Sequence, residues 1–114
     1  MIRNINEDDT TLDRRLLAEC KAAIEEVAPG ASVILYGSRA RGDAREDSDY
    51  DLLVLVDREQ DMELEQAIVS QLIPLEMQTG KALTVLIYNR LQWDSPLYRA
   101  MPFHKNVTRE GMLI

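Results

Sequence analysis

Two short apolar runs constrain the fold of this chain more than any other feature of its sequence. Residues Ser32–Tyr36 (SVILY) and Tyr50–Val56 (YDLLVLV) are rich in β-branched and large aliphatic side chains, and each run has the length of a buried strand. The segment 37–49 between them is polar, rich in small residues and too short for a crossover helix of ordinary length. The sequence therefore predicts two buried strands joined by a loop that contains one helical turn.

Apolar residues at three- and four-residue steps predict an amphipathic helix on either side of this strand pair. The first helix ends before residue 29, and Asp9, Thr10 or Thr11 is available as its N-cap. The second helix follows Asp61 and stops or kinks near Pro74, because proline lacks the backbone N–H group. The apolar positions are Leu12, Leu16, Cys20, Ala23, Ile24 and Val27 in the first helix and Met62, Leu64, Ile68, Val69, Leu72 and Ile73 in the second.

The C-terminal third of the chain predicts a strand, a helix and an apolar tail. Residues 82–88 (ALTVLIY) have the composition of a third strand. Ser95-Pro96 is a helix-start signal, and Glu110-Gly111 is a helix end. The tail, residues 112–114, is expected to add a short edge strand. Three aromatic residues of this region either fill the core or form a partner surface: Trp93, Tyr98 and Phe103.

The charge of the chain argues against one class of partner. Lys and Arg number 13 against 20 Asp and Glu, so the formal net charge is −7 and the pI is about 4.6. Binding of a long phosphate backbone depends on basic side chains that displace counterions, so long nucleic acid is not expected as a partner. A nucleotide chelated to a metal ion remains compatible with this charge.

The length and the cysteine count bear on organisation and compartment. A chain of 114 residues predicts one domain, 1–114, without room for a separate acceptor domain, so any acceptor must be another molecule. The one cysteine, Cys20, lies on the apolar stripe of the first helix, where we expect it to be buried and unreactive. No apolar stretch approaches the roughly 18 to 20 residues of a membrane span, and the N-terminus is acidic, so we expect a cytoplasmic protein without membrane contact.

The residues with chemical potential gather between the two predicted strands. Gly37-Ser38 ends the first strand, and Asp49 and Asp51 stand at the start of the second. Residues two apart in a strand point to the same face, so the two carboxylates are expected side by side. Mg²⁺ prefers such hard oxygen ligands and is commonly held by one or two protein carboxylates together with substrate phosphates.

The same segment contains groups suited to phosphate. A glycine at the end of a strand lets the backbone approach a ligand, and the amides of the following turn, with the Ser38 hydroxyl, can donate to anionic oxygen. Arg39, Arg41 and Arg45 form a cationic cluster in an otherwise acidic chain. A Gly-Ser turn or an Asp-x-Asp pair alone is typical of an ordinary loop or a solvated strand end. Their combination with the arginine cluster indicates a nucleotide site.

The stretch GSRARGDAREDSDYDLLV resembles the signature of the nucleotidyltransferase superfamily, which includes DNA polymerase β and the kanamycin nucleotidyltransferases. The chain as a whole is most similar to the minimal nucleotidyltransferases, small bacterial and archaeal proteins. The resemblance implies an α+β fold like the palm of polymerase β, with a small mixed β-sheet flanked by helices. The site residues that it implies are Gly37, Ser38, Arg39 and Arg41 for the triphosphate, and Asp49 and Asp51 as catalytic carboxylates and Mg²⁺ ligands.

The resemblance also implies a reaction and a partner. Superfamily members transfer a nucleoside monophosphate by in-line displacement at the α-phosphate, with Mg²⁺ neutralising charge. Minimal nucleotidyltransferases are often encoded beside a HEPN-domain protein, and several act as antitoxins that modify a tyrosine of that RNase toxin. The leading hypothesis is therefore transfer of AMP from ATP to a hydroxyl, that of a tyrosine, on a HEPN-domain protein encoded nearby, with which the chain forms a hetero-oligomer. Antibiotic modification is disfavoured, because those enzymes carry an added helical domain.

One position departs from the family pattern. The superfamily usually has a third carboxylate on a neighbouring strand, where it binds one metal ion and can accept the proton of the attacking hydroxyl. Residues 82–88 contain no acid, and Thr84 aligns with that position. Glu76 and Asp94 flank the strand, but the sequence does not place either in the site. The alternative hypothesis is a protein that has lost turnover and neutralises its partner by binding alone.

Overall fold

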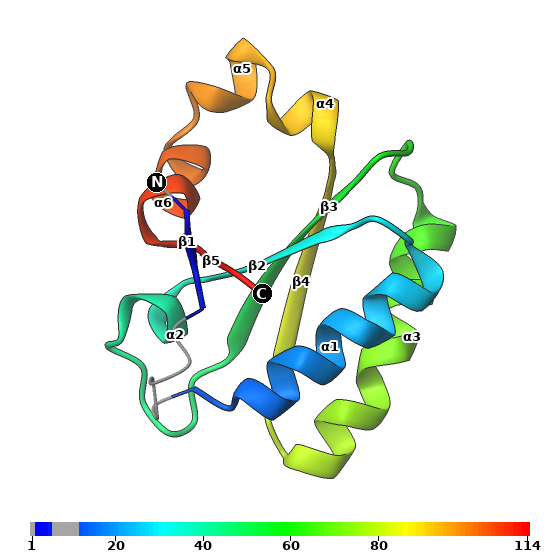
Figure 1. The fold of residues 1–114 in the computed structure, drawn as a ribbon, viewed down its shortest axis with the longest axis vertical. Helices are drawn as coiled ribbons and strands as arrows, with labels where there is room; N and C mark the ends of the chain where they lie inside the picture. Colours follow the sequence, from blue (N-terminus) through cyan, green and yellow to red (C-terminus); the bar gives the residue numbers. More distant parts are fainter. Residues whose placement is uncertain (1, 6–11) are drawn as a thin grey trace.

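A computed structural model describes residues 2–5 and 12–114, and within them five strands form one mixed sheet (Figure 1). The strands lie in the order β1-β5-β2-β3-β4. The strands are β1 (Arg3–Asn4), β2 (Ser32–Tyr36), β3 (Tyr50–Val56), β4 (Leu83–Asn89) and β5 (Met112–Leu113). The helices are α1 (Arg14–Val27), α2 (Ser38–Arg41), α3 (Met62–Thr79), α4 (Arg90–Trp93), α5 (Pro96–Arg99) and α6 (Pro102–Glu110).

The register of the central strands brings three side chains into one row. β2 and β3 are antiparallel with Tyr36 opposite Asp51, and β3 and β4 are parallel with Asp51 opposite Thr84. Residues directly opposite each other point to the same face of a sheet, so Tyr36, Asp51 and Thr84 share one face.

The mixed five-stranded sheet and the helices packed against it confirm the predicted α+β class.

The two faces of the sheet bury different kinds of side chain. One face packs against α1 and α3 through an aliphatic core that includes Leu35, Leu52 and Ile68. The other face lies against the segment that follows β4, and its core, called the aromatic core below, combines aliphatic side chains such as Ile34 and Leu53 with five aromatic ones. The aromatic members of that core are Tyr36, Tyr88, Trp93, Tyr98 and Phe103. Trp93 therefore fills a core, and Tyr98 and Phe103 pack against it while partly exposed.

The strands predicted from the two apolar runs are confirmed with the expected bounds, and α2 is the single helical turn expected between them. The third strand, predicted at residues 82–88, is β4.

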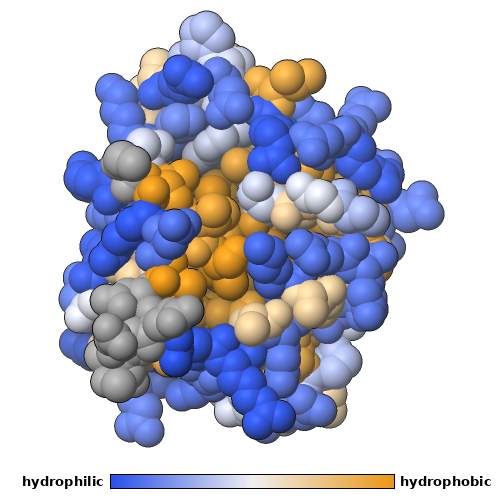
Figure 2. Space-filling model, in the orientation of Figure 1, coloured by the Kyte–Doolittle hydropathy of each residue, from blue (hydrophilic) through white to orange (hydrophobic). Residues whose placement is uncertain are grey.

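The C-terminal tail does form a strand, β5, but the prediction of an edge position is wrong, because β5 pairs with β1 on one side and β2 on the other. β1 has two residues, too few to give a periodic pattern in the sequence. Figure 2 shows an apolar area over β5 and the C-terminus, surrounded by hydrophilic side chains.

The first amphipathic helix is confirmed as α1, but its N-cap is Asp13. The Oδ1 atom of Asp13 accepts a hydrogen bond from the Leu16 N–H at 2.9 Å. The Asp13 N–H in turn donates to the Tyr50 hydroxyl at 3.1 Å, so a residue of β3 fixes where α1 begins. The prediction of an N-cap at Asp9, Thr10 or Thr11 is therefore wrong, and those three residues lie outside the described part of the chain.

The second amphipathic helix, α3, continues through Pro74 to Thr79, so the predicted stop is wrong. An internal proline costs about 3 kcal/mol through its missing N–H and its ring. Leu72 and Leu75, on either side of Pro74, both pack against the aliphatic core, and their burial offsets that cost. The helix ends at Gly80, whose φ is 71°. Among the described residues, no helix is both long and apolar enough to cross a membrane.

The helix predicted between residues 95 and 110 is two helices, α5 and α6. Ser95 caps α5 and Pro96 opens it, as the start signal predicts. Pro102 then opens α6 at its first turn, where the missing N–H costs nothing, and α5 ends at Arg99. The turn between the two helices lets Tyr98 and Phe103 both reach the aromatic core.

Cys20 gives a testable consequence of this packing. The side chain is fully buried, and burial, with smaller contributions from Glu19 and Asp13, raises the pKa of its thiol from 9.0 to about 12. We expect the thiol to resist a disulfide reagent such as DTNB in the native protein near neutral pH and to react once the chain is unfolded.

The same pKa has a consequence for stability. Between pH 9 and 12 the unfolded chain releases the thiol proton while the folded protein keeps it, so the free energy of unfolding should fall as pH rises through this window. Denaturant titrations of the wild type and Cys20→Ala check this, because the variant should lose this part of the pH dependence. A native thiol that reacts as fast as the unfolded one would contradict the burial.

Candidate nucleotide and metal site

The turn after β2 is shaped by the carboxylate of Asp51. Gly37 caps α2 with a φ of 76°, in the region that favours glycine. A Cβ atom at Gly37 would collide with the Oδ2 atom of Asp51. Two separate constraints therefore require glycine at this position: the positive φ of the backbone, and the close approach of the Asp51 side chain from β3. Ser38 follows as the first residue of α2, whose opening amides have no carbonyl partner within the helix.

Asp51 is the central member of the row across β2, β3 and β4. Its Oδ1 atom accepts a hydrogen bond from the Thr84 hydroxyl, while Oδ2 faces Gly37. Burial, together with the Asp51 charge, raises the pKa of Tyr36 to about 12, so this phenol stays neutral. Asp49 directly precedes β3 and is exposed, whereas Asp51 is half-buried. The Asp51 carboxylate thus lies beside the Gly37-Ser38 turn, and Asp49 is in the chain just before the same end of β3.

Arg39 is buried and serves the loop between α2 and β3. Its side chain is 8% exposed, and its Nε and Nη2 atoms donate to the carbonyls of Glu46 and Ser48 at 2.8–3.2 Å. The guanidinium also lies 4.5 Å from the centre of the Tyr50 ring. Arg39 therefore ties α2 to Ser48, the residue just before Asp49. A phosphate contact by Arg39 would compete with these bonds.

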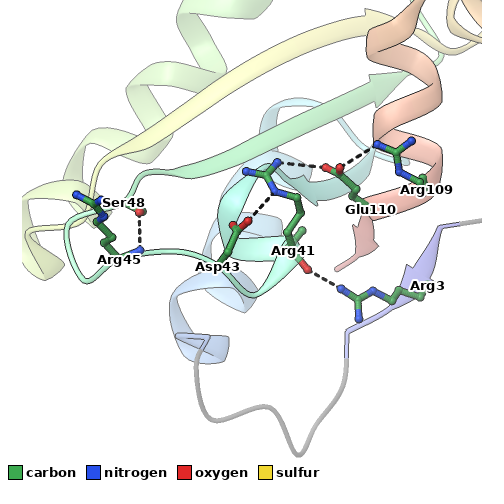
Figure 3. Close-up of polar contacts among 8 residues, drawn as sticks. Arg3, Arg41, Asp43, Arg45, Ser48, Arg109 and Glu110 are labelled. Carbon is green, nitrogen blue, oxygen red and sulfur yellow. Dashed lines mark hydrogen bonds and ion pairs between the residues drawn. The ribbon is translucent and has the colours of Figure 1, made fainter.

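The other two arginines of the predicted cluster lie on the surface. Arg41 pairs with Asp43 at 3.2 Å and with Glu110 at 3.3 Å, which joins α2 to the end of α6 (Figure 3). These bonds raise the pKa of Arg41 above its already high ordinary value. Arg45 is exposed, and its backbone N–H donates to the Ser48 hydroxyl at 2.8 Å. The three arginines are therefore close in sequence but have different roles in the structure.

The structure also locates Thr84, which aligns with the position of the third carboxylate, and the two nearby acids Glu76 and Asp94. Thr84 stands beside Asp51, as the alignment with the family predicts. The Oε2 atom of Glu76 accepts from the Leu83 N–H at 3.0 Å, which places it at the start of β4. Asp94 follows α4, beyond the opposite end of β4. In the part of the chain that the structure covers, no three acidic, histidine or cysteine residues form a group that could hold a metal ion.

Asp49 and Asp51 nevertheless fit a magnesium ion completed by a substrate. Both supply carboxylate oxygen, the ligand type that Mg²⁺ prefers, and such ions are often held by one or two protein carboxylates plus phosphate and water. Asp51 is oriented by the Thr84 hydroxyl and by the backbone of Gly37. The donor set therefore suits a metal–nucleotide complex better than a metal ion held by protein alone.

Sequence reasoning missed one contributor to this site, Tyr36. Its place follows from the strand register, which sets it opposite Asp51. A residue directly before Gly37 in an antiparallel pair must face a residue near the start of the next strand, so the signal was available. Glu76 was a candidate from the sequence, and its place at the start of β4 follows from the continuation of α3 past Pro74.

The clash at Gly37 can be measured against a matched glycine. Gly30 also has a positive φ, 82°, but open space where its Cβ would be. We expect Gly30→Ala to cost about 1–2 kcal/mol from backbone strain alone. Gly37→Ala should cost about 1–3 kcal/mol more, because the methyl group must displace Asp51. Urea unfolding of both variants gives the comparison, and equal losses would contradict the contact.

The role of Arg39 can be tested by amide hydrogen exchange. Replacement by Met or by Lys removes the fork that bridges two carbonyls, so exchange across residues 43–49 should rise in both variants. Arg45→Met is the control, because that side chain is exposed and lies in the same loop. Wild-type exchange in Arg39→Lys would show that the charge alone holds the loop.

Comparison with known proteins agrees with this geometry. The chain matches the nucleotidyltransferase domain family over residues 16–110, which include Gly37, Ser38, Asp49 and Asp51. A search of curated proteins finds no match.

Two solved structures have the same fold. A toxin–antitoxin structure with AMP-PNP superposes with a TM-score of 0.60 at 16% identity, over 90% of this chain and 72% of the other. A protein assigned to the minimal nucleotidyltransferases superposes with a TM-score of 0.56 at 24% identity, over 96% of this chain and 100% of the other. These similarities support the fold, and the family match spans most of the chain. The chain therefore belongs to the nucleotidyltransferase domain family.

Proposed function

We propose that this protein is a Mg²⁺-dependent nucleotidyltransferase that transfers AMP from ATP to a hydroxyl, that of a tyrosine, on a partner protein. The observation that carries the proposal is the packing of the Asp51 carboxylate against the backbone of Gly37. This contact holds Asp51, which would be a metal ligand, beside the turn that would bind a triphosphate, within a chain of the nucleotidyltransferase family. The similar fold found with AMP-PNP in a toxin–antitoxin structure supports nucleotide binding and a protein partner.

The residues of the site have separate roles in this proposal. Asp49 and Asp51 would hold Mg²⁺, which when bound neutralises charge on the phosphates. Gly37 and Ser38 would donate backbone and hydroxyl hydrogen bonds to the triphosphate. Arg41, in the helical turn that follows Gly37, would add positive charge, whereas Arg39 would serve the site by holding the loop before Asp49.

The transfer step follows from these positions. The acceptor oxygen forms a bond to the α-phosphorus while the bond from phosphorus to pyrophosphate breaks, and the hydroxyl proton leaves to solvent or to a carboxylate. Tyr36 remains protonated beside Asp51, so it can donate a hydrogen bond but does not act as the base. The contribution of the protein is mainly positioning and charge.

The partner in this proposal is a HEPN-domain RNase toxin encoded nearby, with the chain acting as its antitoxin in the cytoplasm. One observation supports a protein partner: a chain of similar fold occurs in a toxin–antitoxin structure with AMP-PNP.

Incubation with labelled ATP, Mg²⁺ and the product of the neighbouring gene tests the proposal. Label should appear on a tyrosine of the partner, and Asp49→Ala or Asp51→Ala should reduce transfer by at least about a hundredfold. Asp47→Asn is a matched control, since it neutralises an exposed acid in the same loop. Transfer that persists in both aspartate variants would contradict the proposed nucleotidyltransferase function.

A second function, neutralisation by binding alone, is favoured by one specific observation. Thr84 occupies the position opposite Asp51 and cannot act as an anionic base. In that case the wild type and the Asp49/Asp51 double variant would suppress the activity of the partner equally, with or without nucleotide. Suppression that requires ATP and both aspartates supports transfer instead.

A further inference from the structure

Helix α3 carries a second apolar stripe that the core does not use. Its buried stripe consists of Leu64, Ile68 and Leu72. The second stripe is exposed, with Met62 at 72%, Val69 at 39%, Ile73 at 45% and Met77 at 81%. These four residues are spaced by seven, four and four positions, which places them along one line of an α-helix. From Met62 to Met77 the line is about 22 Å long.

The surface of this stripe is hollowed near its start. A depression of about 480 Å³ is lined by Met62, Glu65, Gln66, Val69 and Ser70. Its floor is apolar at Met62 and Val69, and Glu65 supplies a carboxylate. An apolar side chain of a partner can enter such a depression while a neighbouring basic side chain meets the carboxylate.

The charge of α3 selects the kind of partner. Asp61, Glu63, Glu65 and Glu76 lie in the helix or at its N-cap, and no Lys or Arg occurs between residues 62 and 79. Arg58 forms an ion pair with Asp61, with 3.5 Å between Nη2 and Oδ2, and so balances one of these four negative charges. A second copy of this chain on the stripe would bring acidic side chains against acidic side chains, whereas Lys and Arg around an apolar stripe complement it.

The stripe also leads toward the candidate site. Figure 1 shows the C-terminal end of α3 meeting the start of β4. There the Glu76 carboxylate accepts from the Leu83 N–H, next to the pair formed by Thr84 and Asp51. A partner that lies along α3 would therefore extend to the end of the sheet where Asp51 lies, although α3 covers the sheet face opposite to the Asp51 side chain.

We propose that the exposed stripe of α3, formed by Met62, Val69, Ile73 and Met77, is the docking site for a basic amphipathic helix of the partner protein. A helix suits the long, straight surface, because ridges of one helix pack into the grooves of another. The inference extends the proposed function by naming the chemistry of the acceptor protein, but docking itself needs neither nucleotide nor metal.

A designed peptide tests the proposal without nucleotide or Mg²⁺. The probe is a synthetic helix of about 18 residues, about 27 Å long, with Leu along one face and Lys or Arg beside it. A second peptide has Glu in place of every basic residue. We expect the basic peptide to bind the full chain by isothermal titration calorimetry, and the acidic peptide not to bind.

Three variants on α3 and one control locate the binding surface. Ile73→Ser and Met77→Ser should each weaken the basic peptide by about tenfold, because each removes apolar contact area. Leu97→Ser is the matched control, since Leu97 is 72% exposed on α5 and should leave the affinity unchanged. Glu63→Gln with Glu65→Gln should weaken binding severalfold and reduce its dependence on salt.

Three results overturn the inference. The first is no binding of the basic peptide, and the second is equal weakening by Leu97→Ser and by the α3 variants. The third is a wild-type dimer in sedimentation experiments that Ile73→Ser dissociates, which would make a second copy the occupant. Because Asp49→Ala with Asp51→Ala should bind the peptide like the wild type, failure of transfer and failure of docking are separate results.

Discussion

The contact between the Asp51 carboxylate and the backbone of Gly37 is the constraint on which the site depends. It requires glycine at the end of β2, and it requires β2 and β3 to pair in the register that sets Tyr36 opposite Asp51. A shift by one residue would turn Asp51 to the other face, into the aliphatic core beneath α1 and α3. The hydrophobic register of the sheet therefore fixes the chemistry at its end.

The loop between the two strands is held by a charge placed inside the protein. A buried guanidinium is costly unless its donors are satisfied, and those of Arg39 meet the carbonyls of Glu46 and Ser48. The chain thereby fixes the backbone just before Asp49, while Arg41 links the same helical turn to α6 through Glu110. Two arginines close in sequence thus stabilise the site from opposite sides, one inside and one on the surface.

Much of the central fold could be predicted from the sequence, because β2 and β3 are continuous apolar runs and α1 has a clear helical period. Two of the errors, at Pro74 and at the start of α1, have one cause, which is a tertiary contact that overrides a local signal. Leu75 packs on the core and carries α3 past Pro74, and Tyr50 fixes Asp13 as the cap of α1. The terminal strand β5 became internal because two residues near the N-terminus pair with it, and no local pattern reports a pairing over such a distance.

By itself, the sequence determined the types and spacing of the groups at the site: a Gly-Ser turn, two aspartates one residue apart, and the strands that bring them together. These are local properties, since strand alternation and the conformational freedom of glycine need no distant contact. Only the tertiary structure decided that Arg39 faces inward and that the Thr84 hydroxyl donates a hydrogen bond to Asp51. It also decided that α3 leaves exposed an apolar stripe with acidic residues beside it. Each of these depends on which strand or helix lies alongside, and that is set by how the whole sheet pairs and packs.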